Sequence, residues 1–271
     1  SPLVFLFFAL FTTPVAAERT TEDLSGSWRF LLDDPAGAEA PAYDDSGWDT
    51  VQVPHSWNAL DGQDGGDDYY RGSGWYRRDI PVDAAHDGKR VFLKFHAAQT
   101  VAEVYVNGTE VGRHRGGYSA FVFDVTDAIA FGATNSIAVR VDNSHFEDIG
   151  PVSGDFTISG GLTRKVEMLI TDPVHISPLD YGSPGVYLTT TNVSESSADL
   201  DIRVVAANAE IVSRTVTLES QIRDASGAVV QTLTSSHTLS AGGTASLNQQ
   251  TTVDNPRLWN GRKDPYLYEA R

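Results

Sequence analysis

The stretch that decides the fold is residues 102–111, AEVYVNGTEV, in which two short alternating runs flank an Asn-Gly pair. Asn-Gly between such runs is a strong signal for a type I′ β-hairpin, because both central residues of that turn need positive φ. Similar runs occur at residues 91–95 and 136–141, and helical periodicity is hard to find after the first 17 residues. Several such hairpins in a row predict an all-β protein, built as a sandwich or jelly roll.

A second set of short strands begins near Pro184. Its surface positions are rich in Ser and Thr, and the runs lie at residues 185–188, 200–205, 216–222 and 245–247. Strands at this spacing are typical of a small β-sandwich. Prolines and glycines interrupt both patterns between the two sets. The sequence therefore predicts a first domain, a linker and a second domain over residues 18–175, 176–183 and 184–271.

Composition limits the classes of partner. The 271 residues are 41% hydrophobic and 10% aromatic, which is enough to bury two ordinary cores. The formal net charge of −16 disfavours binding to phosphate backbones and anionic membranes, so we expect no nucleic-acid partner. A neutral partner such as a sugar fits better. The sequence has no cysteine. Disulfides, thiolate metal sites and cysteine nucleophiles are therefore excluded.

The first 17 residues, SPLVFLFFALFTTPVAA, combine a short apolar run with Pro14 and a small-residue site at residues 15–17. This pattern predicts the apolar region and cleavage site of a signal peptide, without the charged region that normally precedes them. A short buried helix or a membrane anchor is the alternative interpretation, but the run is too short to span a bilayer comfortably. We therefore expect a secreted or periplasmic protein with no membrane association after cleavage.

Motifs in a specific order carry a family resemblance. They include PHSWN, YRGSGWYRR, VYVNG, FDVT, VRVDN and GGLTRKV, at residues 54–58, 70–78, 104–108, 123–126, 139–143 and 160–166. Their order and spacing resemble the start of glycoside hydrolase family 2, the family of β-galactosidases and β-glucuronidases. Residues 254–268 are similar to the end of that family's immunoglobulin-like second domain. The resemblance implies a jelly-roll sugar-binding domain followed by an immunoglobulin-like sandwich.

The resemblance also implies a retaining glycosidase that acts on terminal β-linked sugars, and residues 54–58 and 70–72 look most like those of β-galactosidases. In this family two catalytic glutamates lie on a (β/α)8 barrel after the second sandwich; retaining enzymes hold such a pair about 5 Å apart. Because strands and helices do not alternate in this sequence, we expect it to stop before the barrel and to carry no catalytic residue. The barrel of the same polypeptide is then its partner. The alternative is a free-standing carbohydrate-binding or adhesion protein, which similar domains also build.

Three residues are candidates for substrate binding: Asp155, Arg71 and Tyr70. The resemblance implies that loops of the first domain reach over the active site, and residues 70–72 and 152–157 match those loops. Asp155 is the first candidate, because an ionised carboxylate can accept hydrogen bonds from two sugar hydroxyls and such charge-assisted bonds are strong.

Each charged candidate has a structural alternative. Asp155 could bond the backbone of its own turn, as aspartate often does after glycine, and Ser153 could then take its place at the sugar. Arg71 could form an ion pair with Asp67 or Asp68. The residue types alone leave these alternatives open.

No cofactor or metal is predicted. Aspartates crowd residues 61–68, but their spacing does not match the arrangement of glycine and terminal glutamate in an EF-hand calcium loop, so a solvated loop is the simpler interpretation. The histidines are scattered, with no i, i+4 pair that would present two imidazoles to a metal. Each histidine is therefore expected to have a structural role.

Aromatic residues near the acidic loop suit sugar recognition, because their faces pack on C–H surfaces. The alternative is a place in the core, which we expect for Trp28 and Trp48 and for at least one of Trp75 and Tyr76. Basic side chains in the same region are expected to pair with acidic neighbours rather than with phosphate: Arg77 and Arg78.

Overall fold

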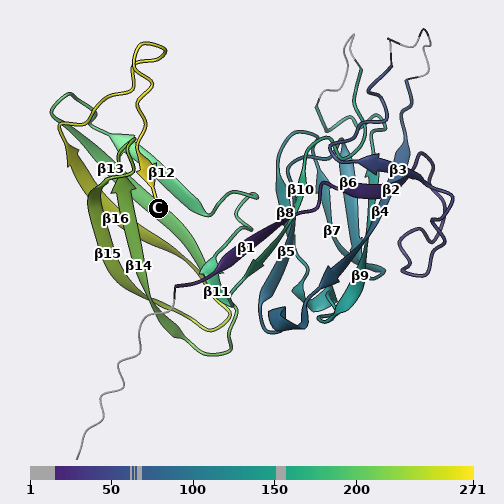
Figure 1. Ribbon diagram of the computed structural model, residues 1–271, viewed down its shortest axis with the longest axis horizontal. Helices are drawn as coiled ribbons and strands as arrows, with labels where there is room; N and C mark the ends of the chain where they lie inside the picture. The colour runs from purple at the N-terminus through teal and green to yellow at the C-terminus, as the bar shows by residue number, and fades with distance from the viewer. Residues whose placement is uncertain (1–15, 62, 64, 66–68, 151–156) are drawn as a thin grey trace, which may run out of the picture.

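The computed structural model of the chain describes residues 16–61, 63, 65, 69–150 and 157–271 (Figure 1). Strands dominate this part of the chain, and its helical elements are two 3-10 turns, η1 (Ala84–His86) and η2 (Thr126–Ala128). The predicted all-β fold is therefore confirmed. No helix in the described part is both long and apolar enough to cross a membrane.

The first domain is a sandwich of two antiparallel sheets. Its strands are β1 (Arg19–Asp23), β2 (Ser27–Leu31), β3 (Asp49–Gln52), β4 (Ser73–Val82), β5 (Arg90–Phe95), β6 (Val101–Val106), β7 (Thr109–Arg115), β8 (Phe121–Asp124), β9 (Ala133–Asp142) and β10 (Val166–Thr171). One sheet has the order β1-β10-β5-β8 and the other the order β3-β2-β4-β9-β6-β7 (Figure 1). This arrangement is the predicted jelly roll.

The hairpin predicted from residues 102–111 is formed by β6 and β7. Val106 pairs with Thr109, and Asn107 and Gly108 between them have φ of 50° and 80°, as a type I′ turn requires. Two other predicted strands lie within β5 and β9, at residues 91–95 and 136–141. Local sequence signals therefore place these strands correctly.

The jelly roll buries aromatic residues on both faces of its six-stranded sheet. Trp28 and Tyr76 belong to the core between the two sheets, with exposed fractions of 1% and 0%. Trp48 and Trp75 are also buried, but in a separate apolar cluster with Ala38. The predicted core positions of Trp28 and Trp48 are confirmed, and both Trp75 and Tyr76 are buried. Because successive residues of a strand face opposite sides, β4 is packed on both faces.

The second domain is a smaller antiparallel sandwich. Its strands are β11 (Val174–Ile176), β12 (Val186–Thr191), β13 (Ser197–Asn208), β14 (Arg214–Arg223), β15 (Val229–Leu239), β16 (Thr244–Asp254) and β17 (Glu269–Ala270). One sheet has β11 and β12 in turn along one edge of β13, with β16 on its other edge. The second sheet has the order β15-β14-β17. Side chains of β13, β14, β15 and β16 form the core, among them Ile202, Ile222, Leu239 and Leu247.

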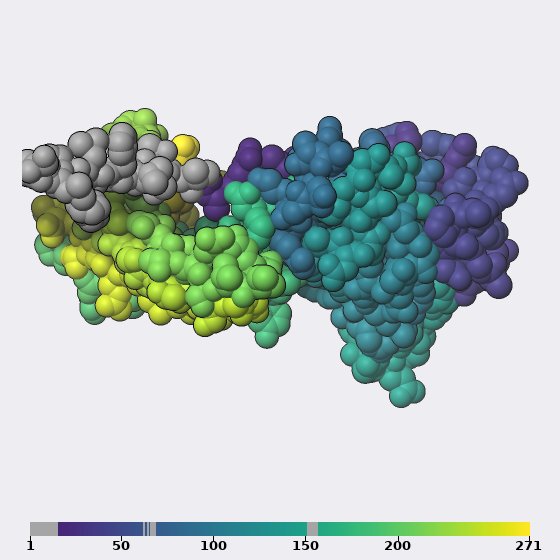
Figure 2. Space-filling model, turned by 90° about the horizontal axis from the view of Figure 1, so that it is seen from below, coloured from purple at the N-terminus to yellow at the C-terminus, as the bar shows by residue number. Residues whose placement is uncertain are grey.

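The two sandwiches form separate lobes, coloured purple to teal and green to yellow in Figure 2. Where they meet, the His175 ring lies 5.4 Å from the Phe92 ring, and Arg19 donates a hydrogen bond to the carbonyl of Ile176. Burial lowers the pKa of His175. Residues 177–185, which include most of the predicted linker, join β11 to β12.

The edge of β14 leads to a prediction about stability. This strand pairs with β15 along its length, whereas the described contacts of its other edge are limited to Gln221, Ile222 and Arg223, which pair with residues 269–271. Open strand edges promote association, and this sandwich has a smaller core than the first. In the isolated chain we expect residues 184–271 to be less stable and more prone to aggregate than residues 18–175. Limited proteolysis should cut the second domain first, and early loss of the first domain with survival of the second would contradict this.

Candidate functional site

The candidate residues gather at one end of the jelly roll. We call the three segments there the loop cluster and define it as residues 53–61, 69–73 and 157–162. The first segment follows β3, the second leads into β4 and the third precedes β10. Loops held by a rigid scaffold are common places for binding residues, so the fold supplies a firm base for this site.

Trp57 packs inside the loop cluster. Its backbone N–H donates to Gly160 O at 3.2 Å, and its ring stacks on Phe30 with 6.0 Å between centroids. A Cβ at Gly160 would lie only 2.0 Å from the Trp57 ring, so a glycine is needed there. Trp57 therefore joins two loops by packing, which is a structural role.

His55 and Tyr76 form a neutral pair next to Trp57. His55 Nδ1 lies 2.7 Å from Tyr76 Oη. Burial lowers the pKa of His55 and raises the pKa of Tyr76, because it penalises the charged form of each group. Both side chains are therefore uncharged at neutral pH, and the hydrogen bond between them supports the loops.

The structure brings two of the three candidates together in the loop cluster. Tyr70 Oη donates to Ser73 O at 2.9 Å, and Arg71 Nε donates to Asn143 O. Burial is the main cause that raises the pKa of Tyr70, and nearby aspartates raise it further. The phenol therefore stays protonated and can act as a hydrogen-bond donor or acceptor. The roles of Tyr70 and Arg71 in substrate binding stay predictions.

Several predicted residues lie outside the described part of the chain. Among them are the first candidate Asp155, its alternative Ser153, and three aspartates of the acidic loop: Asp64, Asp67 and Asp68. Asp61, at the start of that loop, accepts a hydrogen bond of 2.6 Å from Asn58 Nδ2. This bond gives the beginning of the acidic loop a structural attachment to the loop cluster.

No metal centre is assembled from the residues that the structure describes. No group of three His, Asp or Glu side chains among them could hold a metal ion. His96 Nε2 instead lies 2.7 Å from a Glu167 oxygen, and the His114 ring stacks on Phe121 with 4.2 Å between centroids. These histidines have the structural contacts that were expected of them.

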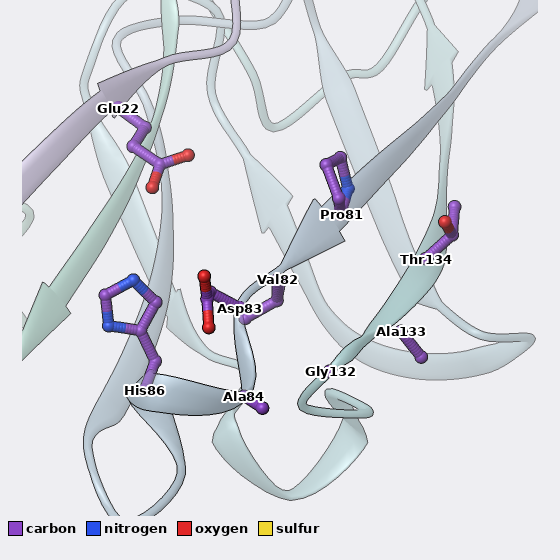
Figure 3. A pocket seen from close by; sticks show the side chains of 9 residues that line it. All are labelled: Glu22, Pro81, Val82, Asp83, Ala84, His86, Gly132, Ala133 and Thr134. Atoms are coloured by element: carbon purple, nitrogen blue, oxygen red, sulfur yellow. The ribbon is translucent and has the colours of Figure 1, made fainter.

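An open hollow lies at the opposite end of the jelly roll (Figure 3). Its ionisable side chains come from β1, from η1 and from the turn before η1: Glu22, His86 and Asp83. Asp83 accepts a hydrogen bond from Ala85 N at 2.8 Å and so caps η1. Because β4 begins at the loop cluster and ends at this hollow, the two sites are separated by the length of that strand.

Two buried asparagines at the loop cluster were not identified from the sequence. Asn58 and Asn143 have exposed fractions of 4% and 0%, and Asn143 Nδ2 donates to Asn58 Oδ1 at 3.1 Å. Asn143 directly follows a clearly predicted strand, and Asn58 ends a motif of the family resemblance. These two positions in the sequence were the signals from which the buried pair could have been predicted.

The fold and the loop cluster define a class of protein: a two-domain β protein with a jelly roll whose polar and aromatic loops gather at one end, followed by an immunoglobulin-like sandwich. Family models match in the same order. Residues 21–173 match the sugar binding domain of glycosyl hydrolases family 2, and residues 184–271 match a second model, described as glycosyl hydrolases family 2. The chain belongs to glycoside hydrolase family 2.

Relatives with known names are glycosidases. A β-glucuronidase of Bacteroides fragilis is 37% identical over 268 residues, which cover 98% of this chain and 37% of that protein. A β-galactosidase of Bacteroides ovatus is 32% identical, with coverage of 95% and 30%. The structure of β-glucuronidase 2 of Bacteroides uniformis superposes with a TM-score of 0.89 at 37% identity, covering 93% of this chain and 30% of that one. The chain thus spans about a third of the length of these relatives, and its described residues contain no (β/α)8 barrel.

Proposed function

We propose that the protein to which this chain belongs is an exported, retaining β-glycosidase, and that the chain shapes and supports its active site. The observation that carries the proposal is the likeness to a β-glucuronidase along 98% of the chain, at 37% identity. The signal-like pattern of residues 1–17 supports export. The loop cluster is the part of the chain that would border a catalytic barrel.

A separate observation supports the retaining mechanism of hydrolysis. The Bacteroides uniformis β-glucuronidase 2 that superposes on this chain is described as covalently bound to cyclophellitol-6-carboxylate aziridine. A covalent bond between enzyme and sugar is what distinguishes the retaining mechanism from the inverting one. The nucleophile and the general acid/base would both come from the barrel, because the loop cluster has no pair of carboxylates among its described residues.

A terminal β-glucuronide is the first substrate candidate. Two relatives, at 37% and 33% identity, are named β-glucuronidases. Arg71 in the loop cluster also suits the carboxylate of glucuronic acid, since a guanidinium binds carboxylates in a planar, two-pronged geometry. A β-galactoside is the second candidate, favoured by the Bacteroides ovatus β-galactosidase and by the motifs at residues 54–58 and 70–72.

Chromogenic substrates test this proposal. The complete protein should hydrolyse a p-nitrophenyl β-glucuronide or β-galactoside, whereas purified residues 18–271 should leave both untouched, as well as the β-mannoside. If purified residues 18–271 hydrolyse a substrate and Asp61→Asn abolishes this activity, the chain is itself catalytic and its proposed supporting role is refuted. Sugar binding without hydrolysis by the complete protein would favour the rival, a carbohydrate-binding or adhesion protein.

A substitution tests the first site candidate. In the complete protein, Asp155→Asn should keep the fold and cost about 2 kcal/mol of transition-state stabilisation, or roughly 30-fold in kcat/KM, because a charged hydrogen bond to the sugar is lost. The matched control is Asp148→Asn, whose carboxylate forms a surface pair with Arg115 and should not affect kcat/KM. Equal kcat/KM values for wild type and Asp155→Asn would identify Asp155 as a turn residue.

A further inference from the structure

Asn143 is the buried polar residue at the centre of the loop cluster. It follows the last residue of β9, and its exposed fraction is 0%. A primary amide has two N–H donors and one carbonyl acceptor, and an unsatisfied polar group in the interior costs about 1–3 kcal/mol. The positions of its hydrogen-bond partners therefore determine which segments Asn143 holds together.

The partners of the Asn143 side chain come from all three segments of the loop cluster. Nδ2 lies within hydrogen-bond distance of Asn58 Oδ1 at 3.1 Å, Tyr70 O at 3.2 Å and Ile158 O at 3.0 Å. Oδ1 accepts a hydrogen bond from Gly72 N at 2.9 Å. One side chain thus connects the loop after β3, the loop before β4 and the loop before β10.

The backbone of Asn143 holds the same loops. Asn143 N donates to Gly72 O at 3.0 Å, so Asn143 and Gly72 are joined in both directions. The backbone carbonyl of Asn143 accepts from Arg71 Nε. Two candidate residues, Tyr70 and Arg71, are therefore bonded directly to Asn143, the first through its backbone and the second through its side chain.

From this geometry we propose that Asn143 is a positioning residue that sets the spacing of the three loops for sugar recognition. It does not touch the substrate itself, because it is buried beneath the loops. Groups that are held in place before binding lose less freedom when the sugar arrives, and small misplacements reduce rates strongly. The part of the proposal that concerns sugar rests on the proposed function, whereas the positioning of the loops does not.

Asn135 provides a matched control. It is also an asparagine with an exposed fraction of 0%. It lies near the start of β9, whereas Asn143 follows the end of this strand. Its Oδ1 accepts from Ala130 N at 2.7 Å and its Nδ2 donates to Ala133 O at 3.1 Å. Alanine at either position removes a buried amide of the same kind, so both variants should lose similar global stability.

Residue-resolved hydrogen exchange on the whole chain separates positioning from stability. In Asn143→Ala, the amides of residues 57, 72 and 161 should exchange at least about 10-fold faster, whereas the amide of Ala130 should not change. Asn135→Ala should give the opposite result. If Asn143→Ala accelerates exchange equally at both ends of the jelly roll, Asn143 is a stability residue only and the proposal is overturned.

Kinetics of the complete protein test the link to sugar. With a p-nitrophenyl glycoside that the protein hydrolyses, Asn143→Ala should lower kcat/KM by about 30-fold or more while Asn135→Ala, at the same loss of Tm, changes it by less than about 3-fold. Equal losses in both variants would overturn the positioning role. Absence of hydrolysis by the wild-type protein would instead overturn the proposed function, and the exchange experiment would still decide what Asn143 does.

Discussion

Replacing Gly161 by alanine is expected to destabilise the jelly roll by about 3 kcal/mol or more. Gly161 has φ of +121°, a conformation that residues with a side chain rarely adopt. A Cβ there would also lie 2.5 Å from Tyr76 Oη and 2.7 Å from His55 O. Neither atom can retreat easily, because Tyr76 is fully buried and the His55 oxygen belongs to the backbone.

Equilibrium denaturation of Gly161→Ala measures this loss directly. The matched control is Gly47→Ala, since no atom lies within 4 Å of a Cβ built there and Gly47 does not have the strained φ. That control should stay within about 0.5 kcal/mol of wild type. If Gly161→Ala lowers the free energy of unfolding by less than about 1 kcal/mol, the loop before β10 shifts easily. The loop cluster would then be less rigid than its hydrogen bonds indicate.

Local signals made much of the fold predictable. The hairpin at residues 102–111 depends on positive φ at two adjacent positions, and Asn107 and Gly108 are the residue types that accept it. Alternation of side chains located the strands of both domains, because each buries one face against a facing sheet. Trp48 was expected to be buried, and so was at least one of Trp75 and Tyr76. The separate cluster that covers Trp48 and Trp75 was not expected, because it depends on a segment with no regular pattern.

The candidate site was harder to predict because its contacts are not local. Tyr70 and Arg71 could be named from a motif, and the structure places both in the loop cluster. Asn143 could not be named in this way, because its role depends on hydrogen-bond partners that are distant in the chain. Asn58 and Gly72, for example, are 85 and 71 residues away. An asparagine after a strand is ordinary in a sequence, and only the assembled sheets show that three loops converge on this one.

The other large effect is expected at Arg77, an arginine on β4 with 3% of its side chain exposed. Its Nε donates to Asp45 Oδ2 at 2.9 Å, and its Nη1 donates to Ala40 O at 3.0 Å and to Ala38 O. The expected pairing with an acidic neighbour is therefore present. Because these partners lie before β3, Arg77 fastens the segment that covers the outer face of the six-stranded sheet.

The adjacent Arg78 is the natural control for this role. Its guanidinium donates to Leu24 O and lies 6.0 Å from the centroid of the Trp28 ring, so it does not share the bonds to the covering segment. Its partner is a backbone carbonyl rather than the acidic neighbour that the sequence suggested. The two arginines thus differ in the number of hydrogen bonds that each makes.

Arg77→Met should cost about 3 kcal/mol, because it leaves Asp45 without its partner and removes the donors from buried carbonyls. Arg78→Met should cost only about 1 kcal/mol. Arg77→Lys keeps the charge but not the planar fork, so its loss should fall between these values. Equilibrium denaturation ranks the three variants, and proteolysis should cut residues 35–47 first in Arg77→Met. If Arg77→Met and Arg78→Met are equally stable, the covering segment is held by Trp48 and Trp75 rather than by the arginine.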